Sequence, residues 1–278
     1  MSEAAEVIEQ MGGVQVNKNR APFYHRRIER LAARAGIKKP RLYVIPDIAP
    51  NACAVGLSID DTAVAVTTGL LSHMDENEIE SVLAHEIGHI QKGHCIEKTK
   101  VAMKAMAISI AAEIGGRMIA TSDLDLTPDD DDSDDLLSTV LKIGIGVAVA
   151  GAGGAVAANA MTADSFRSEF EADECGGTFG RKPWALASAL KKIEELTRAG
   201  EKKFAPEVSQ LFIISPAYLN YKTHPPTAER IERLSNMDAK LQKLPNIPTI
   251  YCSSCGEKTD GDGIYCYWCG GELDVRPS

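Results

Sequence analysis

The histidine pair in VLAHEIGHIQKGH, residues 82–94, constrains this chain more than any other feature. His85 and His89 lie four residues apart, and Glu86 directly follows the first of them. On a helix, residues i and i+4 share a face one turn apart, so both imidazoles can reach a single ion while Glu86 leans toward it. Water activation by zinc needs this arrangement, but two ligands do not complete a site. The rest of the chain must supply a third ligand.

Local patterns place this pair on a helix. In MDENEIESVLAHEIGHIQ, Asp75 and Glu78 have the spacing of a capping box, which predicts a helix start directly before the histidines. Residues 22–36 have helical periodicity and a glycine stop. Further helices are expected near Asp164, in PWALASALKKIEELTRAG and in PPTAERIERLSNMDAKLQ, and a small antiparallel sheet in RLYVIPD, ACAVGLSI and TAVAVTTG. The predicted fold class is α+β and mainly helical.

Size and charge limit the function. A chain of 278 residues can form one substantial core and a small satellite module. A net charge of −9 and a pI near 5.2 argue against nucleic acid as the main partner, because phosphate binding needs a basic face. MSEAAEVIEQMGG lacks the basic start and apolar run of a secretory signal. Four of the seven cysteines cluster near the C-terminus, which is typical of a reduced, cytoplasmic chain that binds metal through thiolates.

Two apolar stretches, roughly 101–120 and 136–161, flank an acidic segment that is expected to be a solvated loop. The first contains Lys104, Glu113 and Arg117, and each charge at mid-membrane costs about 2.5–3.5 kcal/mol. If residues on both sides share one metal, the chain crosses a membrane twice or not at all. Because the first stretch is a poor membrane span, a soluble or peripheral helical hairpin is favoured over a two-span anchor. Membrane association is the open alternative.

Two candidates compete to be the third ligand. A three-histidine site of the form HExxHxxGxxH needs glycine at 92 and histidine at 95, where this chain has Lys92 and Cys95, so His94 is excluded. Downstream, DSFRSEFEADECGG places Glu169 and Asp173 four apart on a predicted helix. A glutamate from a second helix can complete a His/His/Glu set, and an aspartate one turn later can accept the N–H of a ligand imidazole.

HEIGH followed by EFEAD resembles the ExxAD-type gluzincin zinc metallopeptidases, the group that includes HtpX, the Ste-type CAAX prenyl proteases and the Oma-type proteases. The resemblance extends over about residues 25–235. It implies that His85, His89 and Glu169 hold a catalytic zinc. It also implies that Glu86 is the general base and that Asp173 orients a ligand histidine.

Two other stretches match this family. PNACAVG at 50–56 resembles its PNAFATG strand, which implies that the cleft is lined by Asn51, Ala52 and Ala54 and that this strand pairs with the substrate backbone. THPPTAERI resembles its [S/T]HPPxxxRI segment, which implies that His224 stabilises the oxyanion with support from Arg230.

The chain also departs from the family. The family carries Ser-Arg shortly before the ligand glutamate, whereas here Phe166 follows Ser165 and Arg167 is displaced by one position. The basic group that supports the third ligand is therefore unassigned. HtpX-like proteins begin with transmembrane helices, and this chain shows none before residue 100, so membrane residence is not carried over.

The C-terminal sequence CSSCGEKTDGDGIYCYWCGGEL contains two CxxC pairs, each followed by glycine. Their spacing resembles a zinc ribbon with a structural zinc, or less plausibly a rubredoxin-like iron, held by Cys252, Cys255, Cys266 and Cys269. A module this short needs metal for its folding energy. The remaining thiols, Cys53, Cys95 and Cys175, are expected to be small buried residues.

These patterns predict an N-terminal tail (1–21), a zinc metallopeptidase domain (22–244, with an apolar hairpin at 101–163) and a zinc ribbon (249–278). The predicted function is an HtpX-like zinc-dependent endopeptidase with one catalytic and one structural zinc, acting on polypeptide substrates. The expected location is cytoplasmic, with residues 101–161 as the candidate membrane contact. Two alternatives stay open: a latent protease that acts mainly as a zinc-ribbon adaptor, and a metal hydrolase that does not act on peptides.

Overall fold

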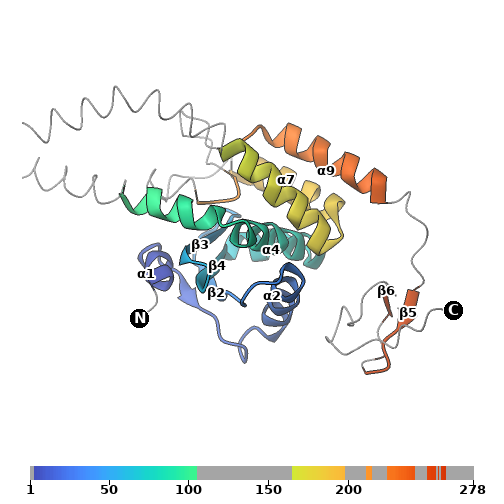
Figure 1. The fold of residues 1–278 in the computed structure, drawn as a ribbon, viewed down its shortest axis with the longest axis horizontal. Coiled ribbons are helices and arrows are strands. Elements are labelled where there is room, and N and C mark those ends of the chain that lie inside the picture. The colour runs from blue at the N-terminus through green and yellow to red at the C-terminus, as the bar shows by residue number, and fades with distance from the viewer. Residues whose placement is uncertain are drawn as a thin grey trace, which may run out of the picture.

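The computed structural model describes residues 3–104, 165–197, 211–214, 224–241, 249–254, 256 and 258–260. Its N-terminal elements are α1 (Glu3–Gln10), β1 (Val14–Gln15), α2 (Pro22–Ala35), β2 (Arg41–Ile45), β3 (Ala52–Ser58), β4 (Asp61–Thr67), α3 (Thr68–His73) and α4 (Glu76–Gln91). Residues 94–104 and 165–180 are also helical. Then come α7 (Pro183–Thr197), α9 (Thr227–Leu241), β5 (Thr249–Tyr251) and β6 (Lys258–Asp260). The described part is mainly helical with a small sheet, as expected (Figure 1).

The main sheet corrects one expectation, because it is mixed and not antiparallel. Its strand order is β1-β2-β4-β3. The β1–β2 and β3–β4 pairs are antiparallel, but β2 and β4 run parallel from the Arg41–Ala63 pair to the Ile45–Thr67 pair. An antiparallel sheet would follow if each strand paired with the next in sequence. Instead, residues 46–51 carry the chain past the position of β4, and β4 then inserts between β2 and β3.

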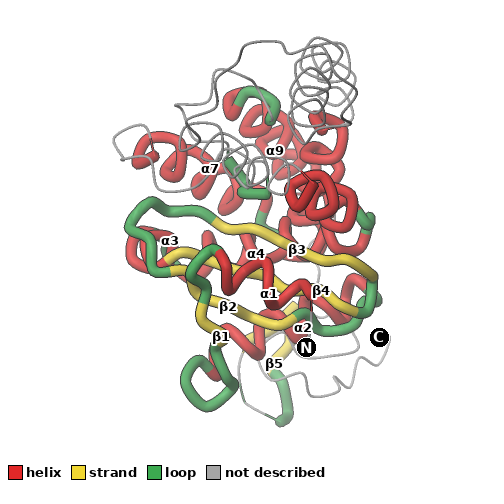
Figure 2. The backbone as a smooth tube through the Cα atoms, turned by 90° about the vertical axis from the view of Figure 1, so that its left-hand side faces the viewer, coloured by secondary structure: helices red, strands yellow, loops and turns green. Residues whose placement is uncertain are grey.

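Both faces of the sheet are covered. Figure 2 shows α1 in front of the strands and α4 behind them. Successive residues of a strand point to opposite faces, so Val64 packs in the core formed with α2 and α4, while Ala65 packs in the core formed with α1. The buried side chains of α1 include Ile8, so residues 3–10, which were expected to belong to a tail, form a helix that completes the second core.

Helix α4 lies at the centre of the main domain, between the sheet and the later helices (Figure 1). Its predicted capping box is confirmed: Asp75 accepts hydrogen bonds from the backbone of Asn77 and Glu78, and the Glu78 side chain accepts one from the backbone of Asp75. The predicted glycine stop of α2 is also confirmed, because Gly36 adopts a left-handed φ of 67° and donates its N–H to the last turn. The capping box fixes where the helix that carries the histidine pair begins, and Gly36 fixes where α2 ends.

The structure describes only residues 101–104 of the predicted apolar hairpin, and these are helical. The remainder of 101–163, including the acidic loop, lies outside the described residues. Within the described ranges, no helix has both the length and the apolar character needed to cross a membrane.

Candidate active site

The HExxH residues are deeply buried in α4: the exposed fractions are 0% for His85, 1% for Glu86 and 5% for His89. Two glycines let the helical residues 165–180 approach this segment closely. A Cβ atom at Gly88 would lie 2.7 Å from Cβ of Cys175, and one at Gly176 would lie 3.1 Å from Cα of His85. Any larger residue at either position would push the two helices apart. The close crossing brings the second helix to the histidines.

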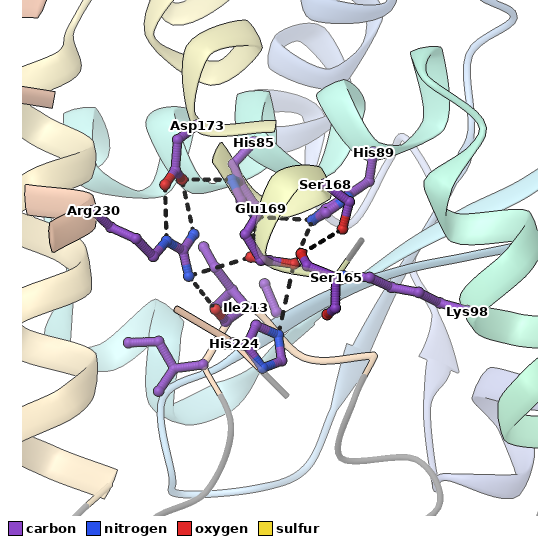
Figure 3. Close-up of polar contacts among 12 residues, drawn as sticks. His85, His89, Lys98, Ser165, Ser168, Glu169, Asp173, Ile213, His224 and Arg230 are labelled. Carbon is purple, nitrogen blue, oxygen red and sulfur yellow. Dashed lines mark hydrogen bonds and ion pairs between the residues drawn. The ribbon is translucent and has the colours of Figure 1, made fainter. Parts of the chain in front are cut away.

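Glu169 meets the two histidines at this crossing (Figure 3). The two histidine Nε2 atoms are 3.1 Å apart, Nε2 of His89 is 3.2 Å from Oε1 of Glu169, and Nε2 of His85 is 3.6 Å from Oε2 of Glu169. Ligands at 2.0–2.1 Å from a tetrahedral zinc are separated by roughly 3.3–3.4 Å. The geometry and the two-nitrogen, one-carboxylate donor set therefore fit zinc. Among the described residues, this is the one group of three or more ligands that could hold a metal.

Asp173 and Arg230 support this cluster from the side away from His89 (Figure 3). Oδ1 of Asp173 lies 2.9 Å from Nδ1 of His85, which leaves Nε2 of that ring for a metal. Arg230 holds both oxygens of Asp173 at 2.8 Å through Nε and Nη2, and its Nη1 is 3.3 Å from Oε2 of Glu169. Burial works to raise the pKa of Asp173, but Arg230 and His85 bring that pKa below its ordinary value. Arg230 thus acts on the site through two carboxylates.

The Glu86 carboxylate lies beside the cluster and next to the backbone N–H of Ala54 on β3, which lowers its pKa. Neither of its buried oxygens has a hydrogen bond of good geometry within the described part of the chain. Together these surroundings raise the pKa of Glu86 to about 8: burial is the largest cause and the Glu169 carboxylate adds to it, whereas Lys98, Arg230 and the Ala54 N–H act to lower it. A buried carboxylate with a raised pKa is suited to take up a proton and release it again.

His224 approaches the same carboxylate from the chain segment before α9. Its Nε2 lies 3.7 Å from Oε1 of Glu169, and the ring is buried. Burial lowers the pKa of His224 to about 3, so the imidazole is neutral at physiological pH. A neutral imidazole can still donate one N–H to a developing negative charge.

Lys98 is the site residue that the sequence analysis missed. It belongs to the helical residues 94–104, and its Nζ lies 2.5 Å from Oε1 of Glu169. Burial works to raise the pKa of Glu169, but Lys98, His224, His89 and Arg230 hold it well below its ordinary value. Lys98 and Arg230 are therefore the basic groups next to the third ligand, a role that the departure near Ser165 left unassigned.

Other candidates lie outside the cluster. Nε2 of His94 is 3.3 Å from Oε2 of Glu171, which also pairs with Arg167, so His94 does not join the metal site. Cys53 and Cys95 are buried and Cys175 is partly buried, as expected for small packing residues. Ala52 and Ala54 lie on β3, at the edge of the main sheet, and Asn51 directly precedes this strand.

Comparison with known proteins assigns the chain. The sequence model of the family described as Peptidase family M48 matches residues 18–238 of this chain. The chain belongs to peptidase family M48. Among its relatives, a protease HtpX homolog from Pyrococcus furiosus is 37% identical over 233 residues, which are 81% of this chain and 77% of the relative. One from Sulfurihydrogenibium sp. is 32% identical over 248 residues, 83% of this chain and 79% of the relative.

A solved structure agrees with this assignment at the level of the fold. The crystal structure of S. mikatae Ste24p superposes with a TM-score of 0.51 at 19% identity, over 84% of this chain. The chain spans 54% of the length of that structure. Together with the HtpX homologues, the family makes this M48 chain a zinc-dependent metallopeptidase, and the alternative of an adaptor protein is not favoured.

The pairing of Lys98 with Glu169 in this M48 peptidase leads to a prediction about zinc binding. We expect Lys98→Met to tighten zinc binding by about tenfold or more, because like charges this close repel by several kcal/mol even at an effective dielectric near 20. The same change should lower the unfolding free energy of the zinc-free protein by about 1–3 kcal/mol, since Glu169 loses a counter-charge. Zinc titration and thermal unfolding with chelator measure both effects.

Lys100→Met is the matched control, because Lys100 is exposed on the same helical segment. It should change neither quantity. Unchanged zinc affinity in Lys98→Met would show that the ammonium and the metal do not compete for Glu169.

Proposed function

We propose that this M48 peptidase cleaves extended polypeptide segments with Glu86 as the general base. One observation carries the proposal: the buried Glu86 carboxylate, whose pKa is raised, lies next to a buried His85–His89–Glu169 cluster whose spacing fits zinc. When bound, zinc supplies Lewis acidity that polarises the scissile carbonyl and lowers the pKa of a water molecule. The residues of the chain then carry the proton transfers.

Glu86 takes a proton from the attacking water as its oxygen bonds to the carbonyl carbon. The carboxylic acid formed in this way returns that proton to the leaving nitrogen as the C–N bond breaks, so the products are a carboxylic acid and an amine and Glu86 is regenerated. A pKa raised by burial favours the first transfer, and the proximity of both reacting groups favours the second.

Asp173 and Arg230 position the ligands in this proposal. Asp173 holds His85 in one tautomer through the 2.9 Å contact to Nδ1. Arg230 fixes Asp173 through two parallel hydrogen bonds, the geometry that a planar guanidinium provides best. The substrate backbone pairs with the outer edge of β3 at Ala52 and Ala54, beside Glu86.

His224 is proposed to donate a hydrogen bond to the oxyanion. His224→Ala is then expected to lower kcat and kcat/KM together by about 10²–10³ with little change in KM, because the bond forms mainly in the transition state. Steady-state kinetics on a fluorogenic peptide measure this. His73→Ala, at an exposed histidine, is the control. Lost zinc would indicate a ligand role for His224, and a lower melting temperature with normal turnover would indicate a structural one.

A second, structural zinc is proposed at Cys252, Cys255, Cys266 and Cys269. Support comes from the turn at the first cysteine: the Ser254 N–H lies 3.3 Å from Sγ of Cys252, and the Gly256 N–H donates to the Cys252 carbonyl at 2.8 Å. The N–H contact to the sulfur favours a thiolate, and the bond to the carbonyl closes the turn around it. The other three cysteines lie outside the described residues. Zinc analysis of Cys252→Ser, which should lose one ion per chain, tests the site.

The cytoplasmic location and the membrane contact of residues 101–161 stay predictions from the sequence. Alkaline carbonate extraction of cell membranes distinguishes them, since a peripheral hairpin is released and a two-span anchor is retained. The proposed function itself is tested by casein cleavage. Chelation should abolish it and added zinc should restore it. Full activity after complete removal of zinc would overturn the proposal.

A further inference from the structure

Residues 211–214 lie against the substrate-binding edge proposed above. Phe212 and Cys53 are partners in an antiparallel β-bridge, and the Ile213 N–H donates to the Ala52 carbonyl at 2.9 Å. This edge of β3 faces away from β4, because β4 pairs with the opposite side of the strand. A short segment of the same chain therefore pairs with β3 where an extended substrate would pair.

Two buried polar side chains hold this segment in place. Nδ2 of Asn51 donates to the Ile214 carbonyl at 3.2 Å, and Nη1 of Arg230 donates to the Ile213 carbonyl at 2.7 Å. Asn51 is only 4% exposed and Arg230 only 1%. Phe212 packs in the core on the α1 face, together with Cys53. The contacts thus fix the backbone and the side chains of the segment at once.

Little of the edge remains for another strand. The Ala52 N–H is taken by the Asn51 side chain at 3.0 Å and its carbonyl by Ile213. Two residues beyond Ala54, the Gly56 N–H donates to Oγ1 of Thr99 at 3.2 Å. Ala54 lies between these two closed positions, and its N–H faces the Glu86 carboxylate. A substrate strand that pairs with both Ala52 and Ala54 has to remove the segment from Ala52.

We propose that residues 211–214 are an autoinhibitory strand that occupies the Ala52 end of the β3 edge, so that a polypeptide substrate binds only after displacing it. The inference rests on the proposed function, because it assumes that β3 is the strand that pairs with substrate. It adds a closed state to that site. The apparent affinity for polypeptides is then the intrinsic affinity multiplied by the fraction of molecules in which the edge is open, while turnover of bound substrate is unchanged.

A single substitution can lock the closed state. In an antiparallel ladder, the residues of a non-hydrogen-bonded pair have Cα atoms about 4.5 Å apart, which is within the range that a disulfide spans. Cys53 and Phe212 form such a pair, because the Ile213–Ala52 hydrogen bond flanks them. Phe212→Cys therefore places a thiol opposite the native Cys53. Burial raises the pKa of the Cys53 thiol, so little of the reactive thiolate is present and disulfide formation is expected to be slow. Oxidation with diamide is therefore followed by mass spectrometry until it is complete.

We expect oxidised, zinc-loaded Phe212→Cys to cleave casein at least about tenfold more slowly than its reduced form, with reduction restoring the rate. Wild type and the double variant Cys53→Ala, Phe212→Cys, treated with the same oxidant, control for oxidation of the other thiols. Equal rates in the oxidised and reduced forms would overturn the autoinhibitory strand. A wild type that does not cleave casein would overturn the proposed function instead, so the two failures are distinguishable.

Amide hydrogen exchange in zinc-loaded Glu86→Gln provides a second test that leaves residues 211–214 unaltered. The Ile213 amide should be protected in the free protein and should exchange at least about tenfold faster with saturating peptide bound. Undiminished protection of Ile213 with bound peptide would contradict the inference, even if Phe212→Cys failed to fold.

Discussion

Glu86→Gln is expected to abolish peptide cleavage while the catalytic zinc stays bound. The amide has the shape of the carboxylate but cannot take a proton from water, and general-base catalysis typically contributes about 10²–10⁴ to the rate. We expect kcat to fall by about 10³ or more. Glu86 contributes no ligand atom to the His85–His89–Glu169 group, so the zinc content should not change.

Parallel measurements of casein cleavage and zinc content test this prediction. Glu97→Gln is the matched control, because Glu97 is an exposed glutamate on the following helical segment, outside the buried cluster. It should leave both quantities at the wild-type level. Loss of the catalytic zinc in Glu86→Gln would show that Glu86 serves as a ligand and would remove it as the base.

Glu169→Gln is expected to have the opposite signature, in which the metal is lost and activity is lost with it. A neutral amide oxygen is a poorer zinc ligand than a carboxylate. The change also leaves the charges of Lys98 and Arg230 beside the metal without the carboxylate that both contact. Substitution of a residue that only hydrogen-bonds to a metal ligand typically lowers metal affinity by about 10–100-fold. We therefore expect the loss of a ligand itself to lower zinc affinity by at least about 100-fold.

Metal analysis after dialysis, together with a zinc titration, measures this effect. The proposed ribbon zinc should remain, so the zinc content should fall by one ion per chain. Glu171→Gln is the control, since Glu171 lies on the same helix and pairs with His94 and Arg167. A Glu169→Gln protein that kept both its metal and its activity would disprove the ligand assignment.

Local spacing in the sequence was enough to predict the catalytic helix. The i, i+4 rule placed His85 and His89 on one face, and the Asp75–Glu78 capping box located the helix start, because both depend on residues within one or two turns. Glu169 and Asp173 came from the same i, i+4 argument combined with a family resemblance. The close approach of their helix to α4 depends on Gly88 and Gly176, which no periodicity marks as contact positions.

The features that escaped prediction depend on contacts distant in sequence or on a change of direction. Lys98 reaches Glu169 because the chain turns at Gly93, with φ of 76°, and starts a new helix, so helical spacing counted from His89 no longer applies. The parallel pairing of β2 with β4 depends on β4 inserting between two earlier strands. The pairing of Phe212 with Cys53 joins residues far apart in the chain, and the apolar run LFII carries no turn signal that points to β3.

In the proposed mode of substrate binding, the hydrogen bond from Ile213 to Ala52 also bears on which peptides the enzyme accepts. The Ala52 carbonyl needs an N–H donor, and every amino acid except proline carries one on its backbone. A strand that replaces the segment is therefore selected by its unpaired backbone more than by its side chains, which favours chain regions that have not yet found a partner strand. A proline at the residue facing Ala52 leaves that carbonyl buried without a donor, so cleavage sites should be depleted of proline at that one position.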